Sequence, residues 1–358
     1  DEVVVEADRY RQNGNESVIK PLGVVADQVQ NVGLLGEKDA LETPFNSMTL
    51  TRKDLDYFGS PEKGPTDMLT LNPAVRDASS NLYNDVSIRG FNLNGHNMYL
   101  NGIQGMLDQQ HAADIYIDKA TVIAGPNLGI VGTPNRENLG GTILFTSKKA
   151  QAEPNLDLTL AYQGGKSFKE AVDFGTRLGH NQRWGVRVMA DNIQGETAID
   201  GDKLTQRDFF VNIDQKTKKS KTNLLVGYNY ADQKGAQFTW NFNEYNQPKG
   251  SRLPKAPDNG RSYLPEWTNN EYDNWIATLN HEQILSDHTT AFFNAGYHRE
   301  DWYGYQYGTP RLQNENGDYT VHPENYPLAV TTKYFGGGIK GKFNLGLTKH
   351  NYVLSADR

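Results

Sequence analysis

The chain has 358 residues, a formal net charge of −7 and no cysteine. Its length allows two domains, its negative charge argues against a nucleic-acid-binding protein, and the lack of cysteine excludes disulfides, cysteine-ligated zinc and thiol catalysis. No apolar run approaches the length of a transmembrane helix, but a transmembrane β-barrel stays possible, because its strands show only short alternating patterns.

The chain begins with a polar pair, Asp1 and Glu2, followed by the three β-branched residues Val3, Val4 and Val5. Nothing close in sequence is suited to pair with such a strand. The segment 1–7 is therefore typical of a strand that is lent to the sheet edge of another protein. Alone the pattern is weak, because many buried first strands look similar.

Residues 1 to about 150 have the sequence pattern of short helices and short strands that is typical of a compact mixed α/β domain. A helix is expected after Thr51, where Asp54 carries a carboxylate suited to the helix N-terminus, and Gly59 is a plausible end. A second short helix is expected from Pro65 to Leu71. Short strands are expected at residues 85–89, 97–100, 120–124 and 141–147.

Beyond Pro154 the sequence alternates between apolar and polar residues with a period of two. Leu156, Leu158 and Leu160 start this pattern, and Ile276 is an exception to it. The alternation continues in segments 171–178, 184–191, 223–230 and 274–280. Short turns at one side and long polar loops at the other are typical of an outer-membrane barrel. We count about nine strands.

Four motifs follow one another in the first part of the chain. They are Ile88-Arg89-Gly90-Phe91, Tyr99-Leu100-Asn101-Gly102, Gly125-Pro126 and Gly140-Gly141-Thr142-Ile143. Their order and spacing resemble the plug domain of TonB-dependent outer-membrane receptors, and the ferric siderophore receptors of the hydroxamate branch most of all. In this resemblance residues 1–7 are the TonB box, 8–40 a linker, 41–150 the plug and 155–358 part of the barrel.

The resemblance implies an α/β plug domain within an all-β antiparallel transmembrane barrel, which has about 22 strands in the family. A half barrel would leave unpaired edges in lipid, so we expect the chain to be part of a longer polypeptide. The implied function is TonB-dependent uptake of a ferric siderophore, the transported ligand. The implied partners are TonB, which would bind Asp1 to Val5, and outer-membrane lipid. The receptor is expected to be a monomer, with no covalently bound cofactor.

The resemblance places the ligand at the extracellular apex, between plug loops and barrel aromatics. The plug residues nominated for ligand contact are Arg76, Gly95, His96, Gln104 and Met106. The barrel residues nominated are Trp240, Phe242, Tyr245, Tyr303 and Tyr305. The alternative for these aromatics is a place in the interfacial girdle of the barrel.

Plug arginines of the family pair with barrel carboxylates and help to seat the plug. Arg89 is available for such an ion pair, whereas Ala124 stands where the family has arginine. We expect Arg89 to be structural rather than a ligand contact. A soft-metal site at His96 and Met98, or at Met106 and His111, is not expected, because no carboxylate or cysteine completes a ligand set.

Other functions remain as alternatives. One alternative is a receptor of the same class whose ligand is haem, cobalamin or another metallophore instead of a ferric siderophore. A passive porin or adhesin-type barrel is disfavoured, because it needs neither a TonB box nor a plug, and a soluble polysaccharide-binding β-protein is more distant. An enzyme is not expected, since no nucleophile motif, phosphate loop or zinc signature is present.

Few basic residues in the apical loops favour a near-neutral hydroxamate over an anionic catecholate.

Overall fold

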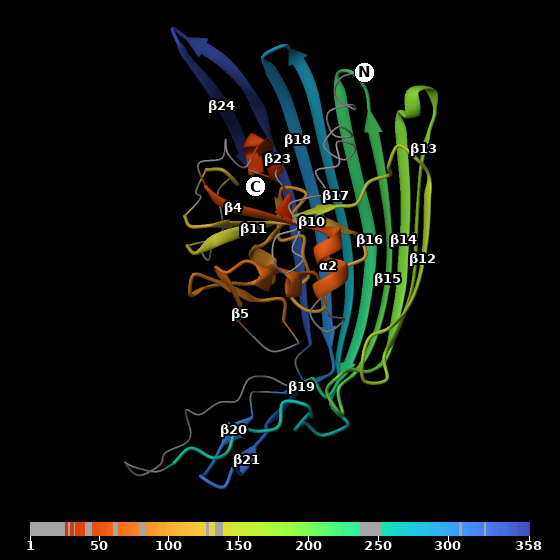
Figure 1. Cartoon of the computed structure of the whole chain (residues 1–358), viewed down its shortest axis with the longest axis vertical. Coiled ribbons are helices and arrows are strands. Elements are labelled where there is room, and N and C mark those ends of the chain that lie inside the picture. Colours follow the sequence, from red (N-terminus) through yellow and green to blue (C-terminus); the bar gives the residue numbers. More distant parts are fainter. Residues whose placement is uncertain are drawn as a thin grey trace.

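A nine-stranded antiparallel sheet curves around a smaller mixed domain (Figure 1). The structure, a computed structural model, describes residues 26–27, 29–31, 33–39, 45–59, 64–78, 83–126, 129–132, 139–236, 252–307, 310–325 and 327–358. The predicted TonB box therefore lies outside the described residues. No helix in the described part is long and apolar enough to cross a membrane.

The smaller domain, which we call the plug, comprises the described residues from 26 to 150. Its central sheet has the order β1-β4-β10-β11-β8-β9. These strands are β1 (Ala26–Asp27), β4 (Asn46–Thr51), β10 (Ile117–Ala124), β11 (Gly141–Ser147), β8 (Tyr99–Leu100) and β9 (Ile103–Gln104). Two smaller sheets contain β5 (Val75–Asp77), β6 (Val86–Ile88) and β7 (Phe91–Leu93), and β2 (Val29–Asn31) and β3 (Glu37–Asp39).

The first predicted helix is confirmed as α2 (Arg52–Phe58). The Asp54 carboxylate accepts hydrogen bonds from the backbone N–H and the hydroxyl of Thr51, at 2.7 and 2.9 Å. At the other end the Gly59 N–H donates to the Leu55 carbonyl. The second predicted helix is the 3-10 helix η3 (Gly64–Leu71). Three further 3-10 turns are η1 (Gly33–Leu35), η4 (Gly95–Asn97) and η5 (His180–Gln182).

Two predicted plug strands are shorter than expected, for local reasons. The predicted strand 97–100 begins only at Tyr99, because the Asn94 side chain accepts from the His96 N–H and starts the η4 turn. The predicted strand 85–89 ends at Ile88, because Arg89 has a positive φ of 52° and turns the chain. The predicted strand 141–147 is confirmed as β11.

The large sheet runs in sequence order, and its strand number is as predicted. Its strands are β12 (Asn155–Tyr162), β13 (Phe168–Leu178), β14 (Trp184–Glu196), β15 (Lys203–Lys216), β16 (Ser220–Lys234), β17 (Asn270–Ser286), β18 (Thr289–Tyr303), β23 (Leu328–Leu345) and β24 (Thr348–Asp357). Short connections at 179–183, 217–219, 287–288 and 346–347 lie at one end, the turn end. The longest connections, 235–269 and 304–327, lie at the other end, the loop end (Figure 1).

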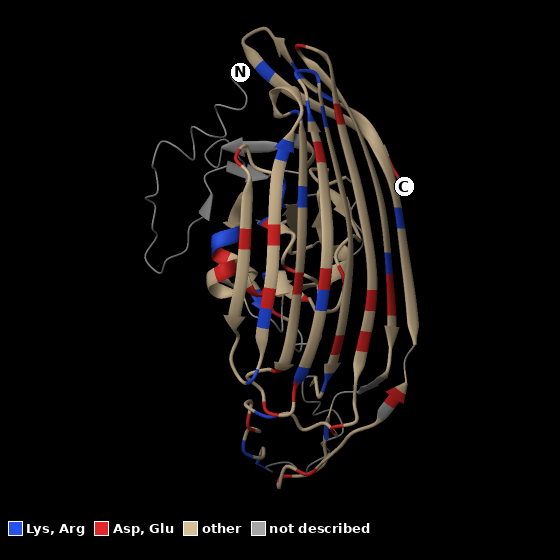
Figure 2. Ribbon diagram, turned by 90° about the vertical axis from the view of Figure 1, so that its right-hand side faces the viewer, with Lys and Arg blue, Asp and Glu red and all other residues tan. Residues whose placement is uncertain are grey.

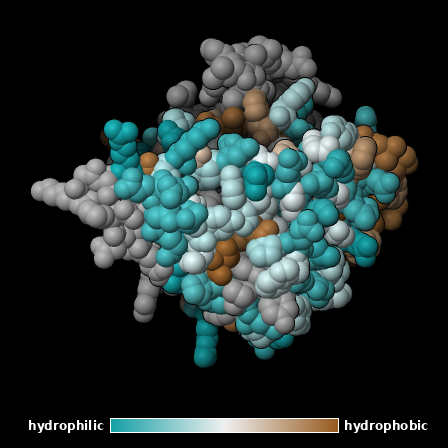
Figure 3. Space-filling model, turned by 90° about the horizontal axis from the view of Figure 1, so that it is seen from below, coloured by the Kyte–Doolittle hydropathy of each residue, from teal (hydrophilic) through white to brown (hydrophobic). Residues whose placement is uncertain are grey.

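The loop end carries four short strands in the 304–327 connection. They are β19 (Tyr305–Tyr307), β20 (Arg311–Leu312), β21 (Tyr319–Thr320) and β22 (Pro323–Asn325), which form two small hairpins. Figure 3 looks onto this end, where hydrophilic residues cover much of the described surface and apolar residues gather chiefly at one side.

Side chains alternate between the concave and the convex face of the large sheet. On the convex face apolar side chains are exposed, among them Leu160, Trp275 and Leu354. On the concave face polar residues and a few large apolar residues meet the plug. Ile276, the exception in the sequence pattern, is one of these and is buried in the core that the plug and sheet share.

Candidate functional site

The concave face of the sheet and the plug form one continuous interface, and the nominated site residues lie along it. Arg76 on β5 is exposed, and its guanidinium donates to the carbonyls of Pro73 and Val75 at 3.1 and 2.7 Å. The strand β5 lies on the part of the plug nearest the loop end (Figure 1). The ligand role of Arg76 stays a prediction.

Gly95 and Met106 are buried. A Cβ at Gly95 would lie 2.9 Å from the Asp108 carbonyl, and the Gly95 N–H donates to Asp85. Met106 has no exposed surface, and its sulfur lies against Gly296 of β18. Both residues thus shape the plug and its contact with the sheet. Their burial counts against direct ligand contact in this arrangement.

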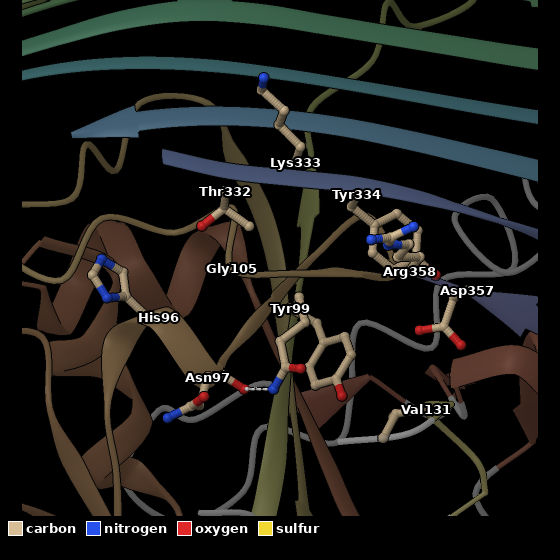
Figure 4. A pocket seen from close by; sticks show the side chains of 11 residues that line it. His96, Asn97, Tyr99, Gly105, Val131, Thr332, Lys333, Tyr334, Asp357 and Arg358 are labelled. Carbon is tan, nitrogen blue, oxygen red and sulfur yellow. Dashed lines mark hydrogen bonds between the residues drawn. The ribbon is translucent and has the colours of Figure 1, made fainter. Parts of the chain in front are cut away.

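His96 and Gln104 border a pocket of about 380 Å³ between the plug and strands β23 and β24 (Figure 4). The Gln104 amide donates to the Asn97 carbonyl at 3.2 Å. Tyr99 also lines the pocket, and its buried hydroxyl has no hydrogen-bond partner in the described part of the chain. Burial, with the nearby Asp357 carboxylate, raises the pKa of Tyr99, so this phenol stays neutral. The ligand roles of His96 and Gln104 stay predictions.

The barrel aromatics are only partly described. Trp240, Phe242 and Tyr245 lie outside the described residues, and Tyr305 is placed by its strand β19 alone. Tyr303 ends β18 on the convex face and is 47% exposed. Its neighbour Trp302 points inward and packs edge-on against Tyr272. The convex position of Tyr303 fits the girdle alternative better than ligand contact.

Arg89, the residue expected to pair with a barrel carboxylate, stays a prediction. It lies exposed in the turn between β6 and β7, with its guanidinium near Gly125. Among the described residues no carboxylate forms an ion pair with Arg89. The nine described strands therefore supply no partner for Arg89, and its predicted ion pair stays untested. Other residues make the charged contacts between plug and sheet.

Lysines and aspartates hold the plug to strands β13 and β14. Lys169 of β13 lies 2.9 Å from Asp114 of the plug and 3.0 Å from Asp191 of β14. Lys148, at the end of the plug, lies 2.8 Å from Asp173 of β13. Charged residues recur along the strands beside the plug (Figure 2). Because these groups are largely buried, each depends on its partner.

Asp114 is the central carboxylate of this group. Burial alone would raise its pKa, but the charges of Lys169 and Arg52 outweigh burial and hold the pKa below its usual range. A lowered folded-state pKa means that the ionised carboxylate stabilises the seated plug above the ordinary pKa, and that this contribution is lost only as the pH falls into strong acid.

We expect Asp114→Asn to lower the stability of the plug by about 2–3 kcal/mol at neutral pH, below the full range for buried pairs because 21% of the side chain is exposed. The denaturant dependence of amide exchange in β10 and β11 measures this. Asp56→Asn is the matched control, because Asp56 also pairs with Arg52 but is 55% exposed, and surface pairs contribute about 0–1 kcal/mol. Equal losses in both variants would contradict the central role of Asp114.

Two histidine–carboxylate pairs cross from the plug to β18. His96 lies 2.5 Å from Glu300, and Asp108 lies 2.7 Å from His298. Sequence reasoning missed Asp108, His298 and Glu300. The signal was the spacing of His298 and Glu300, which a period of two puts on the same concave face. In the described part of the chain no group of three or more His, Cys, Asp or Glu is arranged to hold a metal ion.

Comparisons with known proteins identify the fold. No family model matches the chain. It is 27% identical over 357 residues to the ferrichrome receptor FcuA of Yersinia enterocolitica, covering 98% of this chain and 46% of that protein. The ferric preacinetobactin receptor BauA of Acinetobacter baumannii has a TM-score of 0.85 at 24% identity, covering 94% of this chain and 49% of BauA.

A second solved structure is the pyoverdine receptor FpvA of Pseudomonas aeruginosa, with a TM-score of 0.76 at 15% identity, covering 95% of this chain and 50% of FpvA. The chain thus spans about half the length of the relatives that it matches. The fold is that of a plug with part of a β-barrel, as the sequence predicts.

Proposed function

We propose that this chain supplies the plug and barrel strands of a TonB-dependent outer-membrane receptor that takes up a ferric siderophore. The observation that carries the proposal is the sequence match to a ferrichrome receptor, which extends through plug and sheet alike. The fold supports the proposal. A domain that fills the concave face of a barrel wall would block a passive pore, so it suits a transporter that opens only when the plug is remodelled. The exposed apolar convex face suits contact with lipid.

The orientation follows from the connections. Outer-membrane barrels have short periplasmic turns and long extracellular loops. The loop end would therefore face the outside and receive the chelate, with Arg76 beneath it, and the turn end would face the periplasm. TonB would pair with residues 1–5 there and pull on the plug. Chelate binding alone only shifts the populations of the receptor's conformations. Transport of the chelate against its concentration gradient therefore needs this external energy.

The ligand class that we favour is a hydroxamate-type or mixed ferric siderophore. The nominated plug residues lie in the segments 76–81, 94–97 and 104–109, and Arg76 is the only arginine or lysine in these segments. An anionic catecholate would favour several converging cations, whereas aromatic loop residues suit a near-neutral chelate. A fluorescence titration of the full-length receptor with a panel of ferric hydroxamates and ferric catecholates tests this. Tight binding of catecholates alone would refute the ligand class and leave the receptor class intact.

We expect Trp240→Ala to weaken chelate binding by about 1–3 kcal/mol, because a loop tryptophan that anchors a ligand carries much of the binding energy. Tyr303→Ala is the matched control, since Tyr303 lies at the same end of the sheet but on the convex face. Its effect on affinity should be small. The measurement is the Kd of the best ferric hydroxamate for each variant. Equal losses, or no loss in Trp240→Ala, would count against the aromatic loop as the ligand site.

A further inference from the structure

His298 is a buried imidazole whose two ring nitrogens both face atoms of the plug. Its Nδ1 lies 2.9 Å from the Gly105 carbonyl oxygen, and its Nε2 lies 2.7 Å from Asp108 Oδ1. The side chain is 1% exposed and that of Asp108 is fully buried. One residue of the barrel wall thus holds both ends of plug segment 105–108.

The geometry requires an extra proton. A carbonyl oxygen can only accept, and so can an ionised carboxylate. A neutral imidazole carries a single N–H, so it can donate to one of these two oxygens but not to both. Both contacts form only if the imidazole is cationic, or if the second proton sits on Asp108. In either case the seated pair holds one proton more than a neutral histidine beside an ionised aspartate.

The surroundings favour retention of that proton. The second carboxylate oxygen of Asp108 is buried and has no hydrogen-bond partner among the described residues, so its ionised form is poorly stabilised. Burial raises the pKa of the Asp108 carboxyl, although His298 opposes this. The titratable groups that face the pair of His298 and Asp108 are His96 and Tyr116 from the plug and Glu300 from β18. Tyr272 of β17 interacts in turn with Glu300.

The neighbouring pair behaves differently. In the described part of the chain His96 uses only Nε2, which contacts Glu300. A neutral tautomer of His96 with its proton on Nε2 still donates to that carboxylate. The single contact of His96 therefore needs no extra proton. The requirement for an extra proton belongs to His298 and Asp108 alone.

We propose that His298 is a proton-dependent clamp that fastens plug segment 105–108 to β18 and releases it as the pH rises. In the released state His298 and Asp108 would be hydrated and titrate near their ordinary pKa values, about 6.5 and 3.9. Above about pH 6.5 seating takes up a proton, so the seated fraction falls with rising pH, by up to about tenfold per pH unit. The clamp acts on the plug itself and does not depend on which ligand the protein transports.

The test is amide hydrogen exchange of the full-length protein in detergent between pH 5.5 and 9, with rates divided by the intrinsic exchange rates. For the wild type, protection of residues 98–110 should fall above about pH 6.5 by up to tenfold per pH unit. Protection of β11 (Gly141–Ser147) should stay constant and serves as the internal reference. A flat profile for residues 98–110 in the wild type would overturn the proposal.

Two variants and a control locate the proton. His298→Gln cannot hold an extra proton, so its protection should be low and independent of pH. Asp108→Asn supplies an amide N–H that can donate to Nε2 of a neutral imidazole, so both contacts form without the extra proton. Its protection should not fall above about pH 6.5, which tests the clamp even if His298→Gln does not fold. His281→Gln is the control, because His281 of β17 bonds to Thr222 within the sheet, and it should keep the wild-type profile. A wild-type profile in either His298→Gln or Asp108→Asn would refute the clamp.

Discussion

Replacing Val4 with proline should abolish siderophore uptake while binding at the cell surface survives. Proline has no backbone N–H and is poorly tolerated in a paired strand, so it would remove a hydrogen bond from the segment proposed to pair with TonB. In the proposed receptor the chelate binds outside the cell and TonB pairs in the periplasm, so chelate binding should not depend on that strand. Uptake of radiolabelled iron should fall to the level of cells that lack TonB.

The control for this experiment is Val4→Ile, which keeps a β-branched residue with strong strand preference. Cells with Val4→Ile should take up iron normally, and both variants should bind the ferric siderophore with wild-type affinity. Normal uptake in Val4→Pro would show that residues 1–7 do not couple the receptor to TonB. Loss of binding in Val4→Pro would show instead that the substitution disturbs the plug.

Local sequence rules predicted the parts of this fold that depend on local chemistry. The alternation beyond Pro154 gave the number of strands in the sheet, because one face meets a polar lumen and the other an apolar surface. Thr51, Asp54 and Gly59 marked both ends of α2, because capping depends on residues within one turn. The predicted short turns also lie together at one end of the sheet.

The contacts between plug and sheet were not predictable in the same way. Ile276 broke the alternation, and only the plug core opposite it explains an apolar residue on that face. His298 meets Asp108 across 190 residues of sequence, which no local pattern encodes. Arg89 was expected to seat the plug from its motif alone, whereas the charged contacts with the described strands come from Lys148 and Lys169. The interface therefore depends on register and turn geometry, which a single sequence does not reveal.

The contact of Phe210 with the plug shows how closely the two parts fit. Phe210 of β15 lies opposite Gly227 of β16, and a Cβ at Gly227 would lie 1.9 Å from the Phe210 ring. The other side of the ring stacks on Tyr116 of the plug, with 4.1 Å between ring centroids. Because Gly227 has no side chain, it leaves the space that the Phe210 ring occupies. Tyr116 prevents the ring from moving inward.

Gly227→Val should therefore weaken the seating of the plug by about 3 kcal/mol, the upper end of the range for overpacking, because a rigid ring cannot yield as a flexible side chain does. Amide exchange of residues 112–118, which flank Tyr116, measures the loss. Val226→Ile adds one methylene at the next position on the convex face and should be neutral. Phe210→Leu combined with Gly227→Val should recover most of the protection, because the smaller side chain vacates the space. If Gly227→Val alone leaves amide exchange unchanged, the Phe210 ring can adopt another position. The tight fit between Phe210 and Tyr116 would then not contribute to the seating of the plug.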